Sequence, residues 1–213
     1  MPRTSKLDLA TRVVLGVMAV CGFVYAVAIV SSLAEQLLFD RISRGEFVSD
    51  AELLASHSTR DKAGKAVMGA ALIFNLAWAF WTFRLLHRAW QAEEAPKRIR
   101  PLWEALSVFV PIINLWHPYL VTSAAADRLG ARGASGLLWV WHVVAAGAVV
   151  VRPALSVILA PDAETIAELS FQTWIGAAVL VAQIAGIWVT GLVVTRLSDI
   201  QQSKDTATPA PAR

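Results

Sequence analysis

The distribution of charged residues along the chain constrains its fold more than any other feature. Five stretches lack Asp, Glu, Lys and Arg, and each reaches or approaches the ~18–20 residues that a helix needs to span a bilayer. A soluble helical bundle would place polar residues on every second turn, and these stretches do not. The pattern predicts an all-α integral membrane protein. The stretches are residues 13–34, 66–83, 105–126, 133–151 and 169–195.

Composition supports this class and excludes several others. Apolar residues make up 56% of the chain and charged residues 16%, whereas soluble domains average ~45–50% and ~25%. The single cysteine, Cys21, excludes an intramolecular disulfide and a cysteine-cluster metal site. The net charge of +3 comes from basic residues beside apolar stretches, where they orient helices. We therefore expect membrane lipids rather than nucleic acid as partners, and no cofactor.

The third apolar stretch contains Pro111 and Pro118. In a helix, each proline would remove the hydrogen bond to the carbonyl four residues earlier. Backbone groups freed in this way inside hydrocarbon must find protein or water. Residues 102–126 are therefore predicted to form a proline-broken re-entrant or interfacial segment rather than a continuous span.

Flanking charges lead to the same topology. Basic residues precede the first stretch, follow the second and the last, and flank the third on both sides, whereas the loop after the fourth is acidic. Because cytoplasmic loops are enriched in Lys and Arg, we predict four transmembrane helices plus the broken segment, with both termini cytoplasmic. The predicted parts are a cytoplasmic N-terminus (1–12), spans at 13–34, 66–86, 136–158 and 174–195, an outer loop (35–65) and a disordered cytoplasmic tail (197–213).

Two smaller patterns predict local structure. Ser49 and Glu52 fit a capping box, which predicts a short helix from about Asp50 to Ser56 within the outer loop. Aromatic residues are typical of helix ends at the headgroup layer, and we expect such anchors late in the second span and early in the fourth. These residues are Trp78, Phe80, Trp81, Phe83, Trp139 and Trp141.

The middle of the chain carries a distinctive motif, Pro101-x-Trp103 followed by Pro111-x-x-Asn114-Leu115-Trp116-x-Pro118-Tyr119. This motif resembles the signature of a bacterial family of multi-pass membrane proteins known only as a domain of unknown function. The resemblance covers roughly residues 40–196 and includes the SDAEL stretch after the first span. The family often has an Asn shortly after the Arg-Ala pair that ends the second helix, and this chain departs from that at Arg88-Ala89-Trp90-Gln91-Ala92. The resemblance implies a bacterial plasma (inner) membrane location and no known reaction.

Asn114 and Glu104 are the sharpest candidates for function. One interpretation makes Asn114 part of a broken helix that lines a transport site. The other makes it a helix cap, with Trp116 and Tyr119 as headgroup anchors. Glu104 follows Arg100 by one turn and is expected to form an ion pair with it, with a proton-relay carboxylate as the alternative.

The remaining candidates are weaker. Arg88 and Arg152 are secondary ones, and Arg152 is expected to extend toward the outer headgroups. His87, His117 and His142 fall on the predicted cytoplasmic side without metal-ligand spacing, so no metal site is expected. P-loop, nucleophile-elbow and HExxH motifs do not occur, which argues against an enzyme of those classes.

Three functional hypotheses follow from these patterns. The preferred one is a non-enzymatic inner-membrane component whose basic connection, residues 84–100, binds a partner protein or anionic lipid. The alternative is a small transporter or channel, homo-oligomeric because four helices enclose little volume, that uses the Pro111–Pro118 break. The third, a membrane enzyme acting on lipid, lacks a recognisable motif. The candidate motif is Pro101, Trp103, Glu104, Pro111, Asn114, Trp116, Pro118 and Tyr119, with Arg88 and Arg152 secondary.

Overall fold

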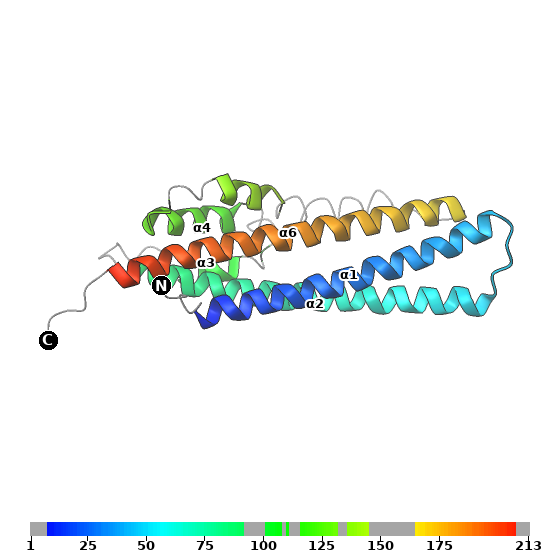
Figure 1. Cartoon of the computed structure of the whole chain (residues 1–213), viewed down its shortest axis with the longest axis horizontal. Coiled ribbons are helices and arrows are strands. Elements are labelled where there is room, and N and C mark those ends of the chain that lie inside the picture. The colour runs from blue at the N-terminus through cyan, green and yellow to red at the C-terminus, as the bar shows by residue number, and fades with distance from the viewer. Residues whose placement is uncertain are drawn as a thin grey trace, which may run out of the picture. The chain divides into compact units, whose positions relative to one another are not determined.

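The structure is a computed structural model that describes residues 8–91, 101–107, 110, 116–131, 136–144 and 165–207. Within these residues all regular structure is helical, and no strand occurs. Residues 136–144 form a further helical segment between α4 and α6. The helices are α1 (Leu9–Ser43), α2 (Asp50–Gln91), α3 (Pro101–Leu106), α4 (His117–Arg128) and α6 (Ile166–Ala207) (Figure 1).

Three helices are long and apolar enough to cross a membrane: Leu9–Ser43, Asp50–His87 and Ile166–Ile200. They indicate a multi-pass helical membrane protein, which agrees with the predicted class. Of the predicted fourth span, 136–158, only residues 136–144 are described, and these are helical. Within the predicted re-entrant segment, 102–126, α3 and α4 are described, whereas Pro111 and Asn114 lie outside the described residues.

The helices around the first connection are longer than predicted. α1 continues past Ala34 to Ser43, and α2 begins at Asp50, well before Ala66. The predicted outer loop, 35–65, therefore shortens to residues 44–49. Neither extension contains proline, and polar side chains along both find partners on neighbouring helices, so nothing there ends a helix.

The predicted disordered tail also needs correction. α6 extends to Ala207, so residues 197–207 are helical. Leu197 is fully buried and Ser198 is 4% exposed, and packing of these side chains holds the helix past Arg196. The first proline of the tail is Pro209. Residues 208–213 lie outside the described residues.

The chain divides into two compact units. Unit 1 comprises Met1–Met18, Phe74–Ala146 and Trp188–Arg213, and unit 2 comprises Ala19–Ile73 and Gly147–Ile187. α1, α2 and α6 each contribute residues to both units, whereas α3 and α4 belong to unit 1 alone.

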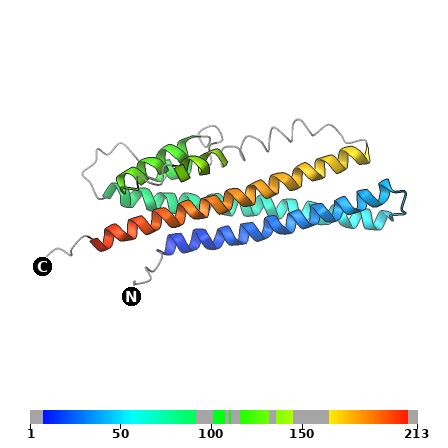
Figure 2. The same ribbon diagram turned by 45° about the horizontal axis from the view of Figure 1, so that its top comes forward.

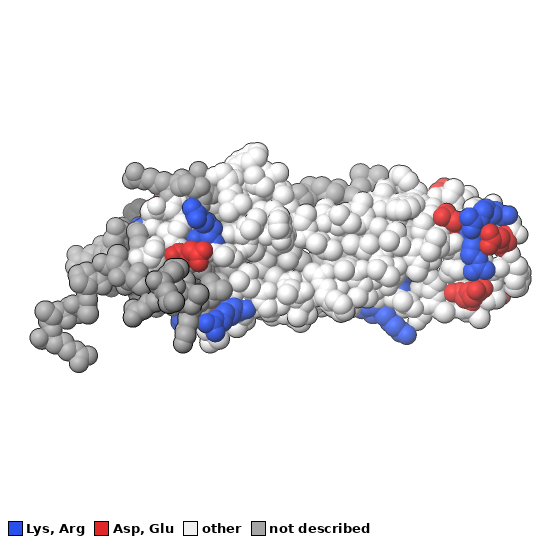
Figure 3. All heavy atoms as spheres, in the orientation of Figure 1, with Lys and Arg blue, Asp and Glu red and all other residues white. Residues whose placement is uncertain are grey.

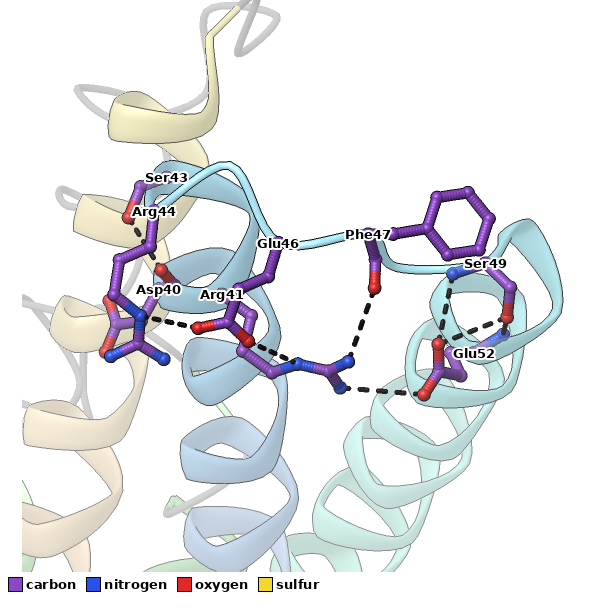
Figure 4. Close-up of polar contacts among 8 residues, drawn as sticks. All are labelled: Asp40, Arg41, Ser43, Arg44, Glu46, Phe47, Ser49 and Glu52. Carbon is purple, nitrogen blue, oxygen red and sulfur yellow. Dashed lines mark hydrogen bonds and ion pairs between the residues drawn. The ribbon is translucent and has the colours of Figure 1, made fainter.

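In unit 2, α1 and α2 form an antiparallel hairpin joined by a short loop (Figure 1). Gly45 takes a positive φ of 77° there, a conformation that glycine adopts without steric cost. The Arg41 guanidinium spans the loop, because Nε lies 3.3 Å from Glu46 Oε2 and Nη1 lies 3.5 Å from Glu52 Oε1 (Figure 4). It also donates to the Phe47 carbonyl at 3.4 Å. These contacts fix the direction of the turn.

The predicted capping box at the start of α2 is confirmed. The Ser49 backbone N–H donates to Glu52 Oε2 at 3.0 Å, and the Glu52 N–H donates to Ser49 Oγ at 3.3 Å (Figure 4). The reciprocal pair satisfies two donors at the helix start. The predicted short helix, Asp50–Ser56, is the first part of α2. Charged side chains gather at this end of unit 2, beside a surface on which few charged side chains are visible (Figure 3).

A buried polar cluster joins α1, α2 and α6 within unit 2. Glu35, 3% exposed, accepts a hydrogen bond from Arg60 Nη1 at 2.6 Å. The same Arg60 nitrogen donates to Thr173 Oγ1 at 3.3 Å. Beside it, the Gln36 amide lies 2.5 Å from Ser170 Oγ, and His57 Nδ1 lies 3.3 Å from Glu35 Oε1. The carboxylate thus has a cationic partner although it is buried, as a buried charge requires.

In unit 1, three tryptophans form the core beside α6. The Trp78 ring lies 5.0 Å from both Trp81 and Trp141, measured between centroids. Trp141 Nε1 donates to Thr190 Oγ1 at 3.1 Å. All three rings are buried, which corrects their predicted role as headgroup anchors. Trp139, 58% exposed, keeps the exposure that such an anchor requires.

Within unit 1, polar contacts join the beginning of α1 to the end of α6 and to α2. Thr11 and Ser198, both buried, share a hydrogen bond of 2.8 Å. Asp8 Oδ1 lies 3.9 Å from Arg84 Nη2. The short helices α3 and α4 and residues 136–144 lie together in this unit (Figure 2).

The buried carboxylate of unit 2 yields a stability prediction. Substituting Glu35→Gln removes the negative charge opposite Arg60 and should lower the unfolding free energy by about 1.5 kcal/mol, the low end for bonds to charged groups. We take the low end because the Arg60 side chain stays 34% exposed and can reach solvent. Thermal unfolding in detergent micelles measures the change.

The matched control is Glu46→Gln, which removes an exposed carboxylate from the loop and should cost less than ~1 kcal/mol. If the two substitutions lower the melting temperature equally, the buried ion pair does not stabilise unit 2.

Candidate functional site

Local sequence explains why two short helices form on either side of the break. Pro101 begins α3 and Pro118 lies in the first turn of α4, where a missing N–H costs nothing. α4 ends at a Schellman motif, in which Gly130 takes a φ of 72°. There, the Ala131 N–H donates to the Ala126 carbonyl at 2.8 Å and the Gly130 N–H to the Asp127 carbonyl at 2.9 Å. The prolines and glycine thus set the bounds of the two helices.

α3 and α4 enclose a small pocket. Its volume is about 220 Å³, well above the ~30 Å³ that one water occupies but below the ~300–1,000 Å³ of sites for drug-sized ligands. Aromatic, aliphatic and ionisable side chains share its wall. The lining residues are Trp103, Glu104, Leu106, Ser107, Val110, Trp116 and His117.

One polar pair crosses the pocket. His117 Nε2, from the first turn of α4, contacts Glu104 Oε2 of α3. The His117 side chain is 29% exposed and the Glu104 side chain 16%, so solvent reaches the pair only in part. Ser107 Oγ donates to the Glu104 backbone carbonyl at 2.6 Å and holds the end of α3. The pair joins two helices that the proline-containing stretch separates in sequence.

The expected partner of Glu104, Arg100, lies outside the described residues. The partner that the structure provides comes from the far side of the break. The Glu104 side chain therefore contributes a contact between α3 and α4.

Several large apolar side chains beside the pocket are exposed. Trp103 is 65% exposed and Trp116 is 48% exposed, although both are large and apolar. Leu102, Leu106 and Leu120 on the same two helices are also exposed. Trp residues are enriched at the interfaces between membrane and water, so these exposed rings are compatible with an interfacial position.

The three histidines make different contacts. His117 pairs with Glu104, the His142 ring lies 4.8 Å from the Tyr119 ring, and the His87 ring stacks on Phe83 at 5.8 Å. Among the described residues, no group of three or more His, Cys, Asp or Glu side chains is placed to hold a metal ion.

The predicted motif falls on both sides of the pocket. Trp103, Glu104 and Trp116 line it, whereas Pro101, Pro118 and Tyr119 belong to the bounding helices. Pro111, Asn114 and Arg152 lie outside the described residues, and so does the side chain of Arg88. The sequence analysis missed Leu106, Ser107 and Val110 as lining residues and considered His117 only as a metal ligand. The signal was available, since a broken helix brings together the residues that flank the break.

The comparisons with known proteins give one match. A family model described as "Domain of unknown function (DUF4328)" matches residues 44–199. No curated protein and no solved structure matches the chain. The matched residues include α2, α3, α4 and most of α6, and therefore the whole pocket.

The contact across the pocket predicts energetic coupling. In a double-mutant cycle of Glu104→Ala and His117→Ala, the second substitution should cost about 1–2 kcal/mol less than it does alone, because its partner is already absent. Unfolding of the full chain in detergent, monitored by circular dichroism, measures each corner of the cycle.

A second cycle of Glu104→Ala with Lys65→Ala serves as the control, because Lys65 pairs with Asp61 at an exposed position of unit 2. Its effects should add. Additive effects in the Glu104–His117 cycle would mean that the contact contributes nothing to stability.

Proposed function

The chain belongs to the DUF4328 family, and we propose that it is a non-enzymatic integral membrane component that binds lipid headgroups at the α3–α4 pocket. The observation that carries the proposal is the pocket itself, which combines exposed Trp103 and Trp116 with the shielded Glu104–His117 pair. The absence of nucleotide-binding, nucleophile-elbow and metalloprotease motifs from the sequence supports the non-enzymatic part.

The proposed topology is four crossings plus one returning segment. α1, α2 and α6 supply three of these crossings, and residues 136–158, of which 136–144 are described and helical, are proposed as the fourth. The stretch Phe74–Ala146, which includes α3 and α4, stays within unit 1. The contact between Glu104 of α3 and His117 of α4 brings the two sides of the stretch together, and this supports the interpretation that residues 102–126 return to the face from which they start.

Charge favours one orientation for this topology. The sequence places Lys97, Arg98 and Arg100 directly before α3, and Arg128 ends α4. Basic residues next to membrane segments mark the cytoplasmic face. Both termini and the α3–α4 segment are accordingly proposed to be cytoplasmic, in a bacterial inner membrane.

In the proposed binding mode, the protein contacts both the acyl chains and the headgroup of a lipid. The apolar side chains Leu102, Leu106 and Leu120 are exposed where acyl chains would contact them, while the pocket offers polar atoms to a headgroup. A channel through the break would depend on Asn114, which lies outside the described residues. Vesicle flux that is abolished by Asn114→Leu would favour that alternative over lipid binding.

Membrane depth tests the interfacial placement. In a Cys21→Ala background, a spin label at Trp103→Cys or Trp116→Cys should report headgroup depth by power-saturation EPR in reconstituted vesicles. Phe23→Cys, on an exposed apolar face of α1, should report hydrocarbon, and Phe47→Cys, in the α1–α2 loop, should report water. Labels at Trp103 that match either reference would contradict the interfacial placement.

Lipid retention tests the binding function. The full chain, purified in mild detergent, should carry bound phospholipid detectable by native mass spectrometry. A Trp103→Ala/Trp116→Ala variant should retain about tenfold less, since apolar contacts worth roughly 0.7 kcal/mol would be lost at each of the two rings. Trp139→Ala is the matched control, being an exposed tryptophan outside the pocket. Equal retention in both variants would contradict the proposed function.

A further inference from the structure

We propose, resting on the lipid-binding function above, that the α3–α4 pocket selects headgroups that carry an ammonium group, such as phosphatidylethanolamine. The observation is the composition of the pocket wall: two tryptophan rings, one carboxylate and no Lys or Arg among the described lining residues. Aromatic rings and a carboxylate both attract a cation, so this combination favours a headgroup that ends in an ammonium group.

The aromatic rings provide the first component. A cation over the face of Trp is attracted by the ring quadrupole, and Trp is the strongest of the aromatic partners. Trp103 of α3 and Trp116 before α4 lie on opposite sides of the break and line the same pocket. An ammonium group inside therefore has an aromatic ring on each side of the break.

The carboxylate provides the second component. Glu104 Oε2 contacts His117 Nε2. Among the described residues Oε1 has no hydrogen-bond donor, so that oxygen can accept from a ligand N–H. Charge-assisted bonds of this kind are stronger than neutral ones. Ser107 Oγ, also in the pocket wall, adds a hydroxyl acceptor. A phosphate or carboxylate group in this position would instead be repelled by Glu104.

Size and access provide the third component. The volume of about 220 Å³ is enough for an aminoethyl group whose phosphate stays outside the opening, and it is smaller than typical sites for drug-sized ligands. The exposed rings at the opening place the pocket where a headgroup reaches it while its acyl chains stay in the bilayer.

The test titrates the full chain in detergent with short-chain lipids and measures dissociation constants by native mass spectrometry. The probes are phosphatidylethanolamine, its N-acetylated derivative, which lacks the positive charge, and phosphatidylglycerol. The proposal expects phosphatidylethanolamine to bind about tenfold more tightly than either, as charge-assisted bonds and ring contacts predict. Equal binding of the three overturns the ammonium proposal and leaves lipid binding intact. No binding of any lipid overturns both.

The decisive variant is Glu104→Gln, because a Gln amide oxygen still accepts a hydrogen bond from His117 and the fold is retained. It should reduce the preference for phosphatidylethanolamine to about twofold or less, whereas the exposed control Glu46→Gln should leave it unchanged. Trp103→Leu, which keeps the pocket apolar, should weaken the preference about two- to fivefold. A preference that survives Glu104→Gln overturns the proposal.

A competition arm distinguishes the source of the ammonium group. Free ethanolamine at the concentration of the lipid should not displace phosphatidylethanolamine, because the soluble amine lacks the acyl chains. Displacement at equal concentration would overturn the lipid assignment in favour of a soluble amine.

Discussion

The constraint on which the rest of the structure depends is the need to satisfy backbone hydrogen bonds inside a bilayer. α1, α2 and α6 meet it by running as continuous helices through their apolar stretches. The third apolar stretch contains two prolines and cannot meet it in that way. The chain instead forms two short helices on either side of the break, each bounded by a proline, and the pocket arises between them.

The buried polar side chains also have to find hydrogen-bond partners inside the protein. Within unit 2 the buried Glu35 is neutralised by Arg60, and Gln36 finds Ser170. Within unit 1, Trp141 donates to Thr190, and Thr11 pairs with Ser198. Each contact satisfies a polar group between helices whose outward faces are apolar. Glu104 differs from these groups, because its only described partner leaves one carboxylate oxygen for a ligand. That difference is why the pocket, and not the Glu35 cluster, is the candidate binding site.

The sequence predicted the class of the fold for a clear physical reason, since long apolar stretches have few stable alternatives in water. The capping box at Ser49 and Glu52 was also predictable, because its chemistry is local. The helix ends at Ser43 and Ala207 were not, because contacts from distant residues decide them. Leu197 and Glu35 continue their helices by burial against neighbours that the local sequence does not reveal.

In the candidate site, too, local features were predicted and long-range contacts were not. Three residues of the proline-tryptophan motif, Trp103, Glu104 and Trp116, line the pocket, whereas the functional role predicted for the motif stays a prediction. The pairing of Glu104 with His117 was not predicted, since helix spacing suggested Arg100 one turn earlier. Periodicity within a helix cannot reveal a contact that crosses a helix break. Trp78 and Trp81 failed as predicted anchors for a related reason, because aromatic residues at a helix end suit a tryptophan core as well as a membrane surface.

The central claim is that α3 and α4 return to the membrane face from which they start. Side-specific cysteine labelling tests it most directly, using a membrane-impermeant maleimide on sealed vesicles of the Cys21→Ala background. Leu102→Cys on α3 and Asp127→Cys near the end of α4 should react from the same side, opposite to Phe47→Cys in the α1–α2 loop. Reaction of Leu102→Cys and Asp127→Cys from opposite sides would contradict the claim.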